Sequence, residues 1–92
     1  MTASFCYKHK ARIVLKKRAV ARPTGRGYYT YTLVFFPRTH TFGVIAAGAN
    51  AAAEQVLLGN DIARAAALFE TLAAHTVSPC HIADVAADLF EA

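Results

Sequence analysis

Cysteine and histidine side chains are the residues of this chain best suited to metal binding or nucleophilic chemistry. Cys6 and His9 stand three positions apart, which on a regular strand directs them to opposite faces. Cys80 and His81 are adjacent, so on a helical turn they point about 100° apart. Neither pair converges as the ligands of a zinc ion must. We therefore expect no metal site, and reduced thiols at both cysteines.

Signatures of catalysis are also missing from the sequence. His40 and His75 add two possible bases, but no serine, cysteine or acid stands at a spacing typical of a catalytic triad. The glycine-rich stretch RPTGRG, residues 22–27, lacks the Gly-Lys-Ser/Thr ending of a phosphate-binding loop. We expect a protein without enzymatic activity and without a cofactor.

Basic residues concentrate in the stretch YKHKARIVLKKR, residues 7–18. Strand alternation predicts that its cations share one face, opposite Phe5, Tyr7, Ile13 and Leu15. The predicted basic face consists of Lys8, Lys10, Arg12, Lys16 and Arg18, and continues into the following loop with Arg22 and Arg26. Residues on one face lie about 6.6 Å apart, close to the spacing of successive phosphates. Lysines on an edge strand also prevent aggregation between sheets, so both interpretations stay open.

Acidic residues are confined to the second half of the chain. Residues 1–53 contain nine of the ten lysines and arginines and no Asp or Glu, whereas residues 54–92 contain all six acids. Three of these acids, Asp84, Asp88 and Glu91, share one face of a predicted helix. The last two lie near its C-terminus, where the helix dipole disfavours negative charge. We expect cations near them, from the basic strand of the same chain or of another chain. Acid–base catalysis by these carboxylates is a weaker interpretation, because nothing predicts a pocket beside them.

Apolar residues at alternate positions predict a strand-rich first part. One strand is expected over residues 4–20, with a bend or bulge near its end, and the stretch RPTGRG forms the loop that follows it. Residues 28–36 are apolar on both faces and predict a central strand. Residues 41–47 predict a third strand. Residues 51–58 suit a helix or a fourth strand, and the flanking turns favour the strand.

Two helices are predicted after residue 59. The first begins with Asn60 as N-cap and Asp61 in the first turn, and runs to about His75. The second has Ser78 as its cap and Pro79 at its first position. The apolar stripe of the first helix comprises Ile62, Ala65, Phe69, Leu72 and Ala73, with Leu68 at its edge. That of the second comprises Ile82, Val85, Ala86, Leu89 and Phe90.

These elements predict one α+β domain over residues 1–92. An antiparallel sheet of three to four strands, basic and spanning about residues 4–58, is followed by two C-terminal helices packed on one face, acidic and spanning about residues 60–92. No apolar run approaches the roughly 20 residues that cross a bilayer, and the first residues do not have the apolar stretch of a signal peptide. We expect a cytoplasmic protein that does not bind membranes. Much of the apolar content is alanine, which favours additional burial in a homodimer.

The C-terminal residues resemble a known family. HTVSPCHIADVAADLFEA, preceded by the stretches YYTYTLVF and TFGVIA, is similar to the ending T-V-T-P-x-x-L-x-x-V-x-x-D-F/L of short uncharacterised proteins from clostridial and related Firmicute genomes. The matching positions are Thr76, Val77, Pro79, Ile82, Val85, Asp88 and Leu89, with Ser78 in place of the second threonine. The resemblance implies a compact bacterial domain with no assigned activity or cofactor.

Together these features predict a small binding or regulatory protein that docks on a macromolecule. The separated charges favour a protein partner, either another protein or a second copy of this chain. Two alternatives stay open. One is nucleic-acid binding through the basic N-terminal strand and the loop at residues 22–26. The other is a phage or mobile-element inhibitor of a host nuclease, comparable to an anti-CRISPR protein.

Overall fold

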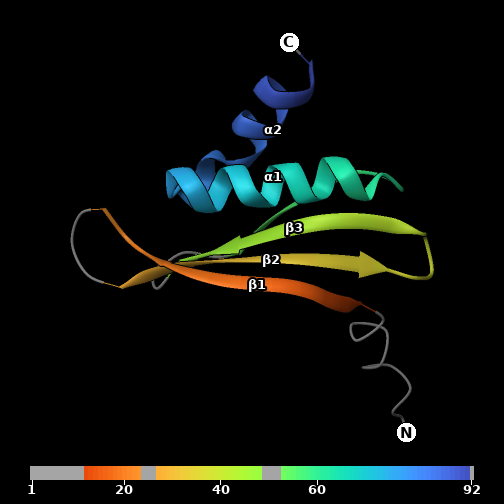
Figure 1. Ribbon diagram of the computed structural model, residues 1–92, viewed down its shortest axis with the longest axis horizontal. Helices are drawn as coiled ribbons and strands as arrows, with labels where there is room; N and C mark the ends of the chain where they lie inside the picture. Colours follow the sequence, from red (N-terminus) through yellow and green to blue (C-terminus); the bar gives the residue numbers. More distant parts are fainter. Residues whose placement is uncertain (1–11, 24–26, 49–52, 92) are drawn as a thin grey trace, which may run out of the picture.

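The computed structural model describes residues 12–23, 27–48 and 53–91. They form a four-stranded antiparallel sheet followed by two C-terminal helices, so the predicted α+β fold is confirmed (Figure 1). The strands lie side by side in chain order: β1 (Ile13–Ala21), β2 (Tyr28–Phe36), β3 (Thr41–Ala47) and β4 (Glu54–Leu57). The helices are α1 (Ile62–His75) and α2 (Ile82–Glu91), and the short 3-10 helix η2 (Pro79–His81) leads into α2.

The two inner strands have the bounds that the sequence predicts. β2 is rich in β-branched and aromatic residues, which fit a pleated surface with both faces at least partly covered. β4 is a strand, as favoured for residues 51–58, although only four of those residues belong to it. β1 and β4 are the two edges of the sheet.

One face of the sheet carries α1 and builds the core. Tyr31 and Leu33 of β2 point toward this face and pack with Val44 of β3. Helix α1 contacts β1, β2 and β3, whereas α2 contacts α1 and β4. The buried residues of α1 are Ala65, Leu68, Phe69, Leu72 and Ala73, as the predicted stripe requires. Its predicted first member, Ile62, is half-exposed instead.

The ends of the helices differ from the prediction in detail. Asp61, not Asn60, is the N-cap of α1, because its carboxylate accepts a hydrogen bond from the backbone N–H of Arg64 at 3.2 Å. Ser78 occupies the predicted N-cap position, but the helix that begins at Pro79 is a single 3-10 turn. The Ser78 hydroxyl makes no capping hydrogen bond there. None of the described helices is long and apolar enough to cross a membrane.

A hydrogen bond from Tyr31 connects the sheet to the segment between the helices. The side chain is fully buried, and its hydroxyl donates to the backbone carbonyl of Val77 at 2.6 Å. Val77 follows Thr76, which ends α1 in the left-handed conformation. Burial raises the pKa of Tyr31 to about 12, with a smaller contribution from neighbouring Tyr29. The folded state therefore favours the protonated phenol.

Replacing Tyr31 by phenylalanine should destabilise the fold without creating a large cavity. The substitution leaves the Val77 carbonyl without this donor, so we expect a loss of about 1 to 2 kcal/mol in the free energy of unfolding. Urea unfolding at neutral pH measures it. Tyr28→Phe is the matched control, because Tyr28 is 61% exposed and its substitution should change stability little.

The same pair of proteins tests the raised pKa. Unfolded tyrosine ionises near pH 10.0, whereas folded Tyr31 ionises near pH 12. The stability gained from the protonated phenol is complete below pH 10.0 and is lost as the pH rises toward 12. The advantage of the wild type over Tyr31→Phe should shrink across that interval. An advantage that stays constant would contradict the burial argument.

Candidate functional site

The cations of β1 lie on both faces of the sheet. Ile13 pairs with Phe35 and Val14 with Val34, but the next pair is Lys16 with Leu33, so Leu15 is an extra residue on β1. Such a bulge reverses the faces of all residues after it. The bulge expected near the end of this strand is present, but the prediction that Lys16 lies opposite Ile13 was wrong, because the faces were assigned by unbroken alternation.

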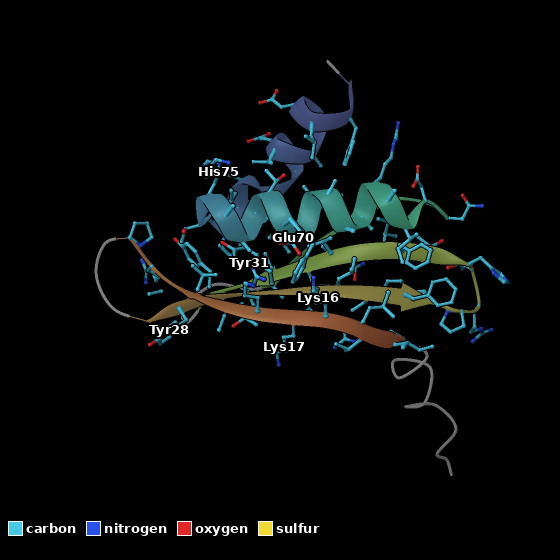
Figure 2. All side chains as sticks on the ribbon, in the orientation of Figure 1. Lys16, Lys17, Tyr28, Tyr31, Glu70 and His75 are labelled. Carbon is cyan, nitrogen blue, oxygen red and sulfur yellow. The ribbon has the colours of Figure 1, made fainter. Side chains whose placement is uncertain are left out.

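Lys16 and Arg18 point toward α1 instead of forming a free basic face. The Lys16 ammonium donates a hydrogen bond to Glu70 at 2.9 Å, and the Arg18 guanidinium lies 3.6 Å from the other oxygen of that carboxylate. Lys16 Nζ also lies 5.8 Å from the centre of the Phe69 ring. Figure 2 shows Lys16 directed toward Glu70 and Lys17 directed away from the helix. All these cations remain about half-exposed or more, so they still contribute to the surface potential.

Glu70 was not among the predicted site residues. The hydrogen bond from Lys16 is the largest cause that lowers the pKa of Glu70. Desolvation raises this pKa, and the charges of Lys16 and Arg18 lower it further, so the net shift is downward. The acids of the second helix were expected to lie near cations of the basic strand. The acid that does so belongs to α1, next to buried Phe69, and is 54 residues away from Lys16 along the chain.

The outer edge of β1 combines exposed cations with exposed apolar side chains. No described strand pairs with this edge, and its nine residues are exposed except for half-buried Val20. Three adjacent apolar side chains are 50%, 53% and 43% exposed: Ile13, Val14 and Leu15. They precede Lys16, Lys17 and Arg18. We call residues 13–18 the β1 edge.

Arg12 and Arg22 are the other described members of the predicted basic face. Arg12 is exposed just before β1. Arg22 stacks on Tyr29, with its guanidinium carbon 5.6 Å from the ring centre. Lys8, Lys10 and Arg26 lie outside the described residues. Of the seven predicted cations, the described part of the structure thus places Arg12, Lys16 and Arg18 on or beside the β1 edge.

Two of the three predicted acidic residues, Asp84 and Asp88, are exposed on α2, where no ion pair to β1 is formed by the described residues. The Asp84 carboxylate lies 3.6 Å from Nδ1 of His81 in the preceding turn. The side chain of Glu91 lies outside the described part of the structure. Asp84 and Asp88 thus form an exposed acidic surface on α2.

Metal-binding side chains do not cluster in the described residues. No group of three His, Cys, Asp or Glu side chains converges there. Cys80 is an exposed free thiol, with its Sγ 3.4 Å from the Ser78 hydroxyl. Cys6 and His9 lie outside the described residues.

Comparison with known proteins adds no relative: no protein-family model, curated protein or solved structure matches the chain. The resemblance of its C-terminal residues to short Firmicute proteins stays a prediction.

The charge contact between β1 and α1 can be tested by titration. Lys16→Met removes the main cause of the low pKa of Glu70, so we expect this pKa to rise toward its ordinary value of 4.5. NMR detection of the Glu70 carboxyl carbon measures it. Because a lowered pKa stabilises the fold above pH 4.5, less stability should be lost on acidification of this variant than of the wild type.

Lys17→Met is the matched control for that titration. It removes the same charge from the adjacent residue, which lies on the opposite face of β1. The pKa of Glu70 should stay low in this variant. Equal shifts in the two variants would show a general charge effect and contradict the specific contact.

Proposed function

We propose that this protein is a small non-catalytic binding protein that docks on an acidic protein partner through the β1 edge. The observation that carries the proposal is the mixture of exposed apolar side chains and cations on an edge strand whose outer side no described strand pairs with. Apolar Ile13, Val14 and Leu15 offer area to bury, and the adjacent cations select for negative charge. A protein surface supplies both complements.

Strand addition is the binding mode that this surface favours. An edge strand presents backbone N–H and C=O groups that an extended partner segment can pair with. Apolar side chains of the partner would then contact Val14 and Leu15, while its carboxylates would meet the cations. Lys17 is well placed for this role, because it points away from α1 and the Glu70 carboxylate (Figure 2).

Nucleic-acid binding is the second candidate, and the bulge weakens it. A row of cations spaced like phosphates requires them on one face, but Lys16 and Lys17 point to opposite faces and Lys16 is held by Glu70.

A second copy of the chain is a further candidate, since α2 exposes Asp84 and Asp88. A host nuclease bound by a phage or mobile-element inhibitor would be one case of the protein partner. The proposal includes a cytoplasmic location.

Affinity capture with matched charge variants tests the partner class. Immobilised protein is incubated with cytoplasmic extract of the native host, with and without nuclease. We expect a specific protein to be retained after nuclease treatment. Lys17→Glu should weaken its retention on the order of tenfold, because an attraction becomes a repulsion. Arg38→Glu changes the net charge equally on the exposed turn after β2 and should retain the partner.

Each alternative has its own result in this experiment. Capture that disappears with nuclease favours nucleic acid, and steep salt dependence of an oligonucleotide mobility shift would support it. A dimer mass in light scattering that falls with ionic strength favours a second copy. Equal loss of the partner in Lys17→Glu and Arg38→Glu would contradict a role for the β1 edge.

A further inference from the structure

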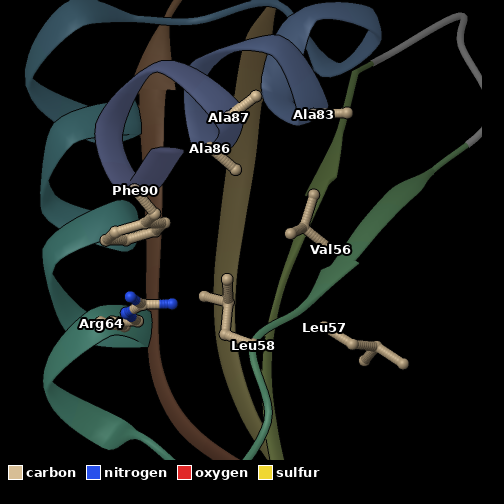
Figure 3. Close-up of a pocket in the computed structure, with 8 residues that line it drawn as sticks. All are labelled: Val56, Leu57, Leu58, Arg64, Ala83, Ala86, Ala87 and Phe90. Carbon is tan, nitrogen blue, oxygen red and sulfur yellow. The ribbon is translucent and has the colours of Figure 1, made fainter. Parts of the chain in front are cut away.

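A pocket lies on the other side of the molecule, where α2 packs beside β4. It has a volume of about 380 Å³ and is lined by side chains from β4 and the residue after it, from the first turn of α1 and from α2 (Figure 3). Sites for small molecules typically measure roughly 300 to 1,000 Å³. The pocket thus lies at the lower end of that range and suits a ligand with one ring or a short chain.

Small residues on α2 leave this space open. Ala83, Ala86 and Ala87 line the α2 side of the pocket, Ala86 points toward Leu58, and alanine methyl groups are too short to fill the gap. The lining residues other than Arg64 are of apolar types, so the tail of an amphiphilic ligand would replace water next to them.

Arg64 supplies the charge of the pocket. Its guanidinium carbon lies 5.0 Å from the centre of the Phe90 ring, and Figure 3 shows the group extending under that ring toward Leu58. Asp61 approaches Nε of Arg64 at 3.9 Å, a long contact, and its other carboxylate oxygen caps α1. Both described contacts leave the Nη fork directed at the pocket. This fork has the geometry that binds a carboxylate through two hydrogen bonds.

We infer that the pocket is a binding site for a small amphiphilic monoanion, a carboxylate with a short aliphatic or aromatic tail. The carboxylate pairs with Arg64, and the tail lies along Val56, Leu58 and the alanines of α2. A monoanion is the matching charge, because one guanidinium that is partly balanced by Asp61 cannot compensate a dianion. Phe90 holds the guanidinium by its ring face and thereby keeps it in place for the ligand.

Octanoate, octanol and octylammonium are the probes, because they share a tail and differ in the head group. Each is titrated below its aggregation concentration into ¹⁵N-labelled protein, followed by two-dimensional NMR. We expect octanoate to shift the amides around Val56, Leu58 and Ala87 and to bind about tenfold more tightly than octanol. Octylammonium should bind least.

Two variants and a control decide the inference. Arg64→Gln should lower the affinity for octanoate to that of octanol and leave octanol unchanged. Ala87→Leu fills the pocket from an exposed helix position and should abolish binding of both. Ala74→Leu makes the same change on α1 outside the pocket and should leave binding intact. Unfolding curves of each variant verify that the fold is kept.

Three results would overturn the inference. One is that octanoate causes no shifts around the pocket. Another is equal affinity for all three probes, which would indicate apolar adsorption without recognition by Arg64. The third is unchanged binding in folded Ala87→Leu. Because no probe or variant alters β1, these outcomes are independent of those for the β1 edge.

Discussion

Packing of α1 on the odd-numbered side chains of β2 is the interaction on which the other contacts depend. Tyr31 and Leu33 contribute the sheet side of this interface, and Leu68, Phe69 and Leu72 contribute the helix side. Alternate residues of a strand point to the same face of the sheet. Burial of these β2 residues therefore determines which residues of β1 and β3 point toward α1. The hydroxyl of Tyr31 then fixes the end of α1, because it holds the carbonyl of Val77.

The bulge at Leu15 determines which cations of β1 meet α1. With regular pairing through residue 15, Lys17 would point at the helix and Lys16 would point away from it. The bulge brings Lys16 to Glu70 and places the Lys16 ammonium near the ring of Phe69. A single extra residue thus converts part of a basic strand into a contact between the two layers, and leaves Lys17 on the other face.

Local patterns in the sequence predicted the elements well. The turn residues and β-branched content of residues 28–47 gave the bounds of β2 and β3, and the 3.6-residue period gave the buried stripe of α1. Both signals depend on neighbouring residues only. Asn60 and Asp61 are both good capping residues, so the sequence does not decide which of them is the N-cap. The backbone φ and ψ angles at these two positions decide it.

The contacts that form the candidate sites could not be predicted in the same way. Simple strand alternation does not allow for an extra residue. The faces predicted for Lys16 and Arg18, which follow Leu15, were therefore the reverse of those in the structure. The partner of Lys16 is distant in sequence, and Glu70 has no pattern that distinguishes it from other helix acids. Arg64 and Phe90 meet only because α2 crosses beside α1, which periodicity alone does not specify.

The two edges of the sheet are protected in different ways, and this difference explains how a defence against aggregation can also select a partner. β4 is only four residues long and has α2 packed beside it. β1 is nine residues long and exposed, so its protection rests on charge. Antiparallel pairing of two β1 strands would bring Lys16, Lys17 and Arg18 against the same residues of the other copy, which like charges disfavour. If the added strand is acidic, each of these repulsive interactions becomes attractive. The charges that exclude a second β1 strand therefore favour a negatively charged partner at the same edge.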